Sequence, residues 1–181
     1  MKKLALVLVL AVIISVGAFA QHPSGWGVGG GYQYGGGWEG GDPGSTLTLF
    51  LKAPSMPIYW GIGLNILDWE FTSNYTYFGL SVTGDSFLIH DTLVPDVGLS
   101  WFLGVGGYLE FHSFSGSNWS RTGLGFGVRV PIGLSIMPIE NLEFFLSVAP
   151  SICLNIELGD FADDPGLGGG WQTDIGFRFW F

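Results

Sequence analysis

Charged residues, cysteine and long hydrophobic runs are all scarce in this chain. Charged side chains make up 12% of the sequence, about half the share that is usual in a soluble domain. After the first 20 residues, no uninterrupted apolar run reaches the roughly 20 residues that a membrane-spanning helix requires. These shortages exclude a soluble enzyme of ordinary composition and a bundle of membrane helices.

Basic residues are also few, and there is a single cysteine. Six Lys and Arg stand against 15 Asp and Glu, so the formal net charge is −9, a sign that disfavours binding to nucleic acid. The one cysteine, Cys153, cannot form a disulfide within the chain. Stability therefore has to come from the fold itself.

Glycine and apolar residues, in contrast, are abundant. The sequence contains 31 glycines, 48% of its residues are hydrophobic, 16% are aromatic, and the mean hydropathy is +0.42. That much apolar surface can offset the entropy of the chain, so the chain is predicted to fold. The fold has to explain an apolar chain that glycine interrupts throughout.

The N-terminal segment has the three parts of a secretory signal. Lys2 and Lys3 form its positive part, an apolar stretch follows, and Ala18-Phe19-Ala20 is an A-x-A cleavage site. We expect residues 1–20 to be removed, which leaves one domain over residues 21–181.

The rest of the chain alternates with a period of two. In the last segment, every second residue from Ile175 to Phe181 is apolar, which gives a strand one uniformly apolar face. The same pattern predicts eight strands, over residues 25–34, 45–53, 57–67, 74–89, 97–112, 120–137, 142–157 and 171–181.

The connections between these segments alternate in length. Those after the second, fourth and sixth segments are mostly tight and contain proline, whereas the others are longer and rich in glycine, serine or acidic residues. Short turns at one end and long loops at the other are typical of outer-membrane barrels. The predicted fold is all-β, an eight-stranded antiparallel up-and-down transmembrane β-barrel with a filled lumen. A soluble lipocalin-like barrel, with its apolar face inward, is the competing fold.

The positions of the charges favour the membrane barrel. Strand parity places eight charged residues on the glycine-rich face, where we expect a network inside the lumen: Lys52, Asp85, Glu110, Arg121, Arg129, Glu143, Asp174 and Arg178. So few charges would be sparse for a surface in water. Glycine on the same face leaves room for larger neighbours. Pro131 and Pro150 each remove a ladder bond, so we expect bulges or register breaks there.

Two parts of the sequence resemble known outer-membrane proteins. The last six residues look like the C-terminal signal of outer-membrane barrels, with Phe177, Phe179 and Phe181 at alternate positions. This resemblance implies insertion by the barrel-assembly machinery. The stretches Leu51–Gly61 and Arg129–Ser135 resemble a spirochaete family of small outer-membrane barrels without assigned activity, similar in architecture to small porin-like and adhesion barrels. Neither resemblance implies a biochemical activity.

Few residues indicate catalysis or cofactor binding. The G-x-G-x-x-G run that begins at Gly25 follows a cleavage site rather than a strand, so no cofactor is expected. His112 has serines nearby and Glu110 on the same face, but a base must lie within hydrogen-bond reach of its nucleophile, which spacing alone does not establish. Cys153 is more typical of a small packed residue than of a nucleophile. We expect neither enzymatic activity nor a metal site.

The long connections hold the residues that we expect to contact partners. They carry seven carboxylates and no Lys or Arg, together with aromatic residues of the kind enriched in interfaces. The candidate contact residues are Trp38, Glu39, Asp42, Trp69, Glu70, Trp119, Asp160, Phe161, Asp163 and Asp164.

Together these features predict a non-enzymatic integral outer-membrane barrel that presents acidic, aromatic loops in a structural, adhesion or ligand-binding role. Its partners would be outer-membrane lipid, the barrel-assembly machinery and a host or envelope macromolecule, and not nucleic acid. A narrow porin, or a passage for a small apolar ligand, is the alternative from the transport class. A hydrolase or acyltransferase that uses His112 at the rim is a third hypothesis.

Overall fold

Antiparallel strands make up nearly all of the structure. The computed structural model describes residues 25–37, 44–65, 75–116, 118–159 and 165–181. Its strands are β1 (Gly27–Gly37), β2 (Gly44–Lys52), β3 (Tyr59–Asn65), β4 (Tyr75–Val94), β5 (Leu99–Gly116), β6 (Ser120–Arg129), β7 (Ile132–Ile139), β8 (Leu142–Gly159) and β9 (Gly166–Trp180). One short 3-10 helix, η1 (Pro95–Val97), joins β4 to β5. Within these ranges, no helix is long and apolar enough to cross a membrane. The predicted signal over residues 1–20 lies outside them.

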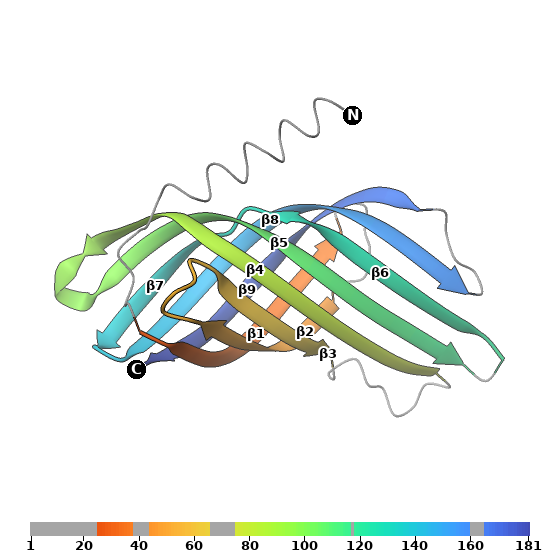
Figure 1. Cartoon of the computed structure of the whole chain (residues 1–181), viewed down its shortest axis with the longest axis horizontal. Coiled ribbons are helices and arrows are strands. Elements are labelled where there is room, and N and C mark those ends of the chain that lie inside the picture. Colours follow the sequence, from red (N-terminus) through yellow and green to blue (C-terminus); the bar gives the residue numbers. More distant parts are fainter. Residues whose placement is uncertain (1–24, 38–43, 66–74, 117, 160–164) are drawn as a thin grey trace.

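The strands close into a ring. Adjacent strands pair antiparallel throughout, β4 pairs with β5, and β1 pairs with both β2 and β9. Figure 1 shows the strands running obliquely around the barrel, with the C-terminus and the β7–β8 turn at the same end. The all-β antiparallel barrel that the alternation predicts is therefore confirmed. We call the end that holds the β2–β3, β4–β5 and β7–β8 turns the turn end, and the opposite end the loop end.

The sixth predicted segment is divided into β6 and β7, but without the expected change of register. Both strands lie between β5 and β8, and the register against each of them is the same before and after Pro131; the β7–β8 register shifts only later, between Ile136 and Ile139. The amide of Val130 donates to the carbonyl of Pro150 (3.0 Å), and the amide of Gly104 donates to the carbonyl of Pro131 (2.8 Å). Each proline lacks one donor, yet its carbonyl still accepts a bond from a neighbouring strand. The predicted register breaks at Pro131 and Pro150 are therefore wrong.

Real irregularities occur elsewhere, and several strand ends differ from prediction. The β4–β5 register shifts between Phe87 and Ile89, and again between Thr92 and Val94. The strand β4 continues to Val94, past its predicted end at residue 89, and β5 continues to Gly116, so that the connection after the fifth segment is short rather than long. Bulges increase local twist at barrel rims, and side-chain alternation does not reveal them.

Burial follows strand parity closely. In β8, Glu143, Phe145 and Ser147 are buried, whereas Phe144 and Leu146 are exposed. Large apolar side chains are likewise exposed on the outside of the other strands, including Val28, Leu49, Ile62, Phe78, Leu109, Phe126, Leu134 and Ile175. A closed barrel with an apolar exterior and polar residues inside is the arrangement that spans a membrane. It is the opposite of the lipocalin-like arrangement, which is excluded.

Candidate functional site

The turn-end half of the lumen is filled by aromatic side chains. Six buried rings form one group, which we call the aromatic cluster: Phe50, Tyr59, Phe87, Phe102, Phe145 and Trp180. The ring of Phe87 stacks on Tyr59, with centroids 4.3 Å apart, and on Phe102, with centroids 4.4 Å apart. The cavity left beside them measures about 10 Å³, barely enough for one water molecule. This half of the barrel is closed by packing.

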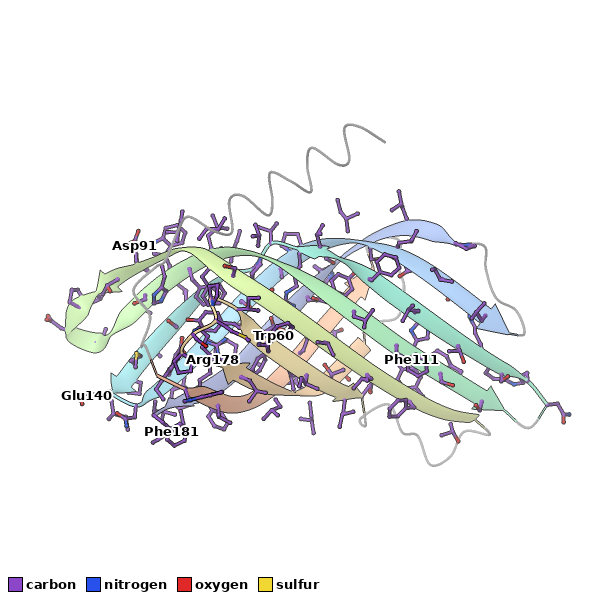
Figure 2. All side chains as sticks on the ribbon, viewed as in Figure 1. Trp60, Asp91, Phe111, Glu140, Arg178 and Phe181 are labelled. Carbon is purple, nitrogen blue, oxygen red and sulfur yellow. The ribbon has the colours of Figure 1, made fainter. Side chains whose placement is uncertain are left out.

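An ion pair lies within the aromatic cluster. The Arg178 Nη1 and Trp180 Nε1 groups both donate to Glu143 Oε2, each over 3.1 Å. The guanidinium of Arg178 also lies 4.0 Å from the ring centroid of Phe145 and 4.9 Å from that of Tyr59, where the ring faces stabilise its charge. Figure 2 shows Arg178 among the strands, at the same end of the barrel as Phe181.

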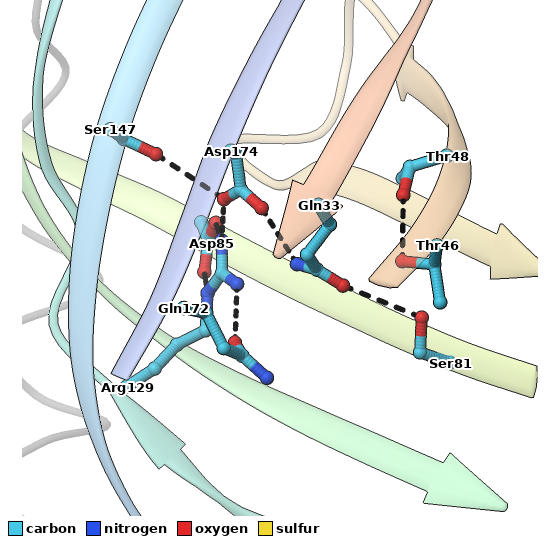
Figure 3. Close-up of polar contacts among 9 residues, drawn as sticks. All are labelled: Gln33, Thr46, Thr48, Ser81, Asp85, Arg129, Ser147, Gln172 and Asp174. Atoms are coloured by element: carbon cyan, nitrogen blue, oxygen red, sulfur yellow. Dashed lines mark hydrogen bonds and ion pairs between the residues drawn. The ribbon is translucent and has the colours of Figure 1, made fainter. Parts of the chain in front are cut away.

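A second charged group, the arginine centre of Arg129, Asp85 and Asp174, lies above this cluster. Arg129 Nε and Nη2 donate to the two oxygens of Asp85, over 2.9 and 2.6 Å, and Nη2 also donates to Asp174 Oδ2 over 2.7 Å (Figure 3). All three residues are buried. One guanidinium thus ties together three strands, β4, β6 and β9, across the lumen.

Uncharged polar residues extend the arginine centre. Gln33 Nε2 donates to Asp174 over 2.7 Å, Ser147 Oγ donates to the same carboxylate over 3.2 Å, and Arg129 Nη1 donates to Gln172 over 2.7 Å. These three partners were not among the predicted site residues. The inward parity of two of them was available in the sequence, since Ser147 lies four residues from Glu143 and Gln172 lies two residues from Asp174 on the same strand. Gln33 lies on β1, where no inward charge was predicted, and it pairs with Asp174 across the β1–β9 ladder.

The other three predicted lumen charges are placed differently. The Lys52 ammonium donates to the carbonyl of Ala53 over 2.6 Å and lies 5.5 Å from the ring centroid of Tyr59. Arg121 forms an ion pair with Glu157, a residue at the predicted end of its strand that sequence reasoning did not select. Glu110 forms no ion pair with Lys or Arg among the described residues.

The loop-end half of the lumen is hollow. A cavity of about 510 Å³ lies there, which we call the lumen cavity. Its wall includes Tyr77, Glu110, His112 and Phe114, and Gln172 of the arginine centre's extension lies at its base. The expectation of a filled lumen therefore holds for the turn-end half alone. The volume falls within the range of small-molecule pockets, roughly 300–1,000 Å³.

Glycines create this space and leave room for the rings of His112 and Tyr77 on its wall. A Cβ on Gly123 would collide with the ring of His112, and a Cβ on Gly79 would lie 3.0 Å from the Tyr77 hydroxyl. The Gly168–Gly170 run of β9 also lines the cavity. Glycine on the inner face thus has two effects, because it admits large neighbours and leaves part of the lumen empty.

The residues considered for catalysis lie on this wall without an assembled mechanism. His112 contacts the ring of Phe114, with centroids 5.7 Å apart, and among the described residues no serine hydroxyl is hydrogen-bonded to it. Cys153 is a free thiol that also lines the cavity. The described part of the chain contains no group of three metal-ligating side chains.

Most of the predicted loop residues fall outside the described ranges. These are Trp38, Glu39, Asp42, Trp69, Glu70, Asp160, Phe161, Asp163 and Asp164. Trp119 is described and is exposed, beside the β5–β6 connection. At the other end, Phe177, Phe179 and Phe181 are exposed on the outer face, with the rings of the last two 5.2 Å apart.

Comparison with known proteins gives this chain a family. Residues 34–177 match the model of a family described as "Protein of unknown function (DUF3996)". The chain belongs to the DUF3996 family. No curated protein matches it.

Three solved structures of small outer-membrane proteins are similar to this DUF3996 member. Neisserial surface protein A (NspA) is 14% identical, with 86% of this chain and 96% of that chain covered and a TM-score of 0.47. A major outer membrane protein from Thermus thermophilus is 13% identical, with 87% and 98% covered and a TM-score of 0.46. Ail, the attachment invasion locus protein of Yersinia pestis, is 16% identical, with 86% and 99% covered and a TM-score of 0.46.

Proposed function

We propose that this protein is a non-enzymatic outer-membrane anchor that presents its acidic, aromatic connections at the cell surface. The observation that carries the proposal is the pairing of an apolar exterior with a turn-end lumen closed by packing. Such a barrel is rigid and held in lipid, and it does not need an open channel to serve as a support. Connections on a rigid scaffold are where binding residues concentrate.

The orientation of the barrel can be tested by labelling cysteines on intact cells. Two variants are made in a Cys153→Ser background, Asp163→Cys in the β8–β9 connection and Glu140→Cys in the β7–β8 turn. A membrane-impermeant maleimide should label the first on intact cells and the second only after the outer membrane is permeabilised. Labelling of Glu140→Cys on intact cells, or of both variants equally, would contradict the proposed orientation.

The binding role is tested by trimming the connections. We expect the intact barrel to bind a host or envelope macromolecule, and a barrel with shortened connections at 38–43, 66–74 and 160–164 to lose that binding. Both proteins are compared at equal amounts of folded barrel, which is measured by resistance to denaturation in detergent. Equal binding by the two would assign recognition to another surface.

The same proposal includes two finer parts. Phe177, Phe179 and Phe181 are proposed as the signal that the barrel-assembly machinery reads, and their alternate exposure on the outer face supports this role. The stretches Leu51–Gly61 and Arg129–Ser135 support kinship with small spirochaete barrels. Deletion of Phe181 should lower the amount of assembled barrel in the membrane while leaving refolding of the purified protein unchanged.

A further inference from the structure

The lumen cavity combines aromatic rings with a carboxylate. Tyr77 and Phe114 lie on its wall with ring centroids 4.6 Å apart, and Tyr108 lines it from the same strand as Phe114. Glu110 lies between Tyr108 and His112 in the inward positions of β5. Faces of aromatic rings attract cations, and attract them more strongly where water is excluded.

The charges around this cavity do not balance. The guanidinium of Arg129 is shared by Asp85 and Asp174, and that of Arg121 is paired with Glu157. No lysine of the described ranges lines the cavity. Glu110 therefore remains as a carboxylate that no Lys or Arg of the described chain pairs with, and His112 lies two residues along β5 on the same cavity wall.

The arginine centre adds to the negative potential, because it holds two carboxylates and one guanidinium. Two carboxylates, Asp85 and Asp174, surround that single cation beyond Gln172, which lines the cavity and accepts a hydrogen bond from Arg129. Among the described residues of the cavity wall, the carboxylates of Glu110 and Glu157 outnumber the one guanidinium, that of Arg121. In a narrow space between low-dielectric walls, such an excess draws in positive charge.

We propose that the lumen cavity binds a small organic ammonium ion, with the rings of Tyr77 and Phe114 against its alkyl groups and Glu110 as its counter-ion. The inference goes beyond the surface role of the connections and does not depend on it. An anion would meet the unpaired carboxylate of Glu110, and a purely apolar ligand would leave that carboxylate without a partner. An ammonium ion satisfies both the rings and the carboxylate.

The test is calorimetric titration of the whole purified barrel with choline. The protein is held in a non-ionic polyoxyethylene detergent, because detergents with choline headgroups would compete for the same site. The reference ligand is the neutral isostere of choline in which a carbon atom replaces the nitrogen, and glucose serves as a hydroxyl-rich neutral ligand. We expect saturable binding of choline to one site, and binding of the isostere at least about tenfold weaker.

Three variants separate this proposal from non-specific binding. Glu110→Gln removes the counter-ion at constant size, and Phe114→Leu removes one ring. Each should weaken choline binding by about tenfold, while Glu140→Gln, the same charge change at the exposed turn end, should leave it unchanged. Circular dichroism and gel mobility establish that each variant is folded, and Phe114→Leu still tests the site if Glu110→Gln is not. Failure of choline to saturate, equal binding of the isostere, tighter binding of glucose, or unchanged binding by the folded variants would overturn the proposal.

Discussion

Replacement of Arg129 with Met is the most informative single change in this barrel. Arg129 is 2% exposed, and its guanidinium makes three charged hydrogen bonds of 2.6–2.9 Å to Asp85 and Asp174. Methionine matches much of the length of the side chain but leaves both carboxylates buried without a cation. Removal of one partner from a buried ion pair costs about 3–5 kcal/mol. Because two carboxylates lose their cation together, we expect a loss of about 4 kcal/mol or more in the free energy of unfolding.

The assay is urea unfolding of the barrel in lipid vesicles, followed by tryptophan fluorescence. The exposed turn residue Glu140 provides the control, since Glu140→Gln should change stability by less than about 0.5 kcal/mol. A variant that combines Arg129→Met with Asp85→Asn and Asp174→Asn should recover most of the loss, because no buried charge is left unpaired. A loss below about 1 kcal/mol for Arg129→Met alone would refute the view that this pair of carboxylates depends on it.

Three further outcomes follow from the lumen and its packing. Glu143→Gln should lower the free energy of unfolding by about 3 kcal/mol in the same urea titration, because it leaves the buried Arg178 without a carboxylate; a change no larger than that of an exposed carboxylate would contradict this. Gly29→Ala should prevent assembly of the folded barrel, because its Cβ would collide with the backbone oxygen of Phe177. Gly30→Ala should fold, because its Cβ would lie 3.8 Å from the nearest atom. The gel mobility of the two unheated proteins shows which of them is folded. In planar bilayers the wild-type barrel should give no steady single-channel openings, because packing closes its turn end, and reproducible openings would favour the porin hypothesis instead.

The alternation of residue types in the sequence predicts the faces of the strands well, because each face meets a different environment. Along β8 the buried and exposed residues follow the predicted parity from Glu143 to Ile152. The alternation predicts strand ends poorly where glycines lack side chains. The strand β9 begins at Gly166, five residues before its predicted start, and the glycines there give no alternation of apolar and polar residues from which the strand could be predicted. The alternation also does not predict which charged residues pair. The ion pair of Arg121 with Glu157, for example, depends on the register between β6 and β8.

Strand parity alone does not predict the lumen cavity. Its volume depends on how many small residues meet at one height of the barrel, and that depends on the relative stagger of all the strands. The number of inward charges in the sequence predicts an interior that is filled along its whole length. The structure instead places the aromatic cluster at the turn end, whereas the space at the loop end is lined in part by small residues such as Thr46, Ser81 and Gly168.

The central claim is that the apolar face of the barrel meets lipid while the opposite face is packed inside. It is tested most directly by nuclear Overhauser spectroscopy of the methyl-labelled barrel in lipid nanodiscs, without any substitution. Leu146 and Val148 are exposed on the outside of β8, and Ala149, the next residue, is fully buried inside. The account predicts cross-peaks from the acyl chains to the methyl groups of Leu146 and Val148, and none to Ala149. Cross-peaks from water to Leu146 and Val148, or from acyl chains to Ala149, would contradict it.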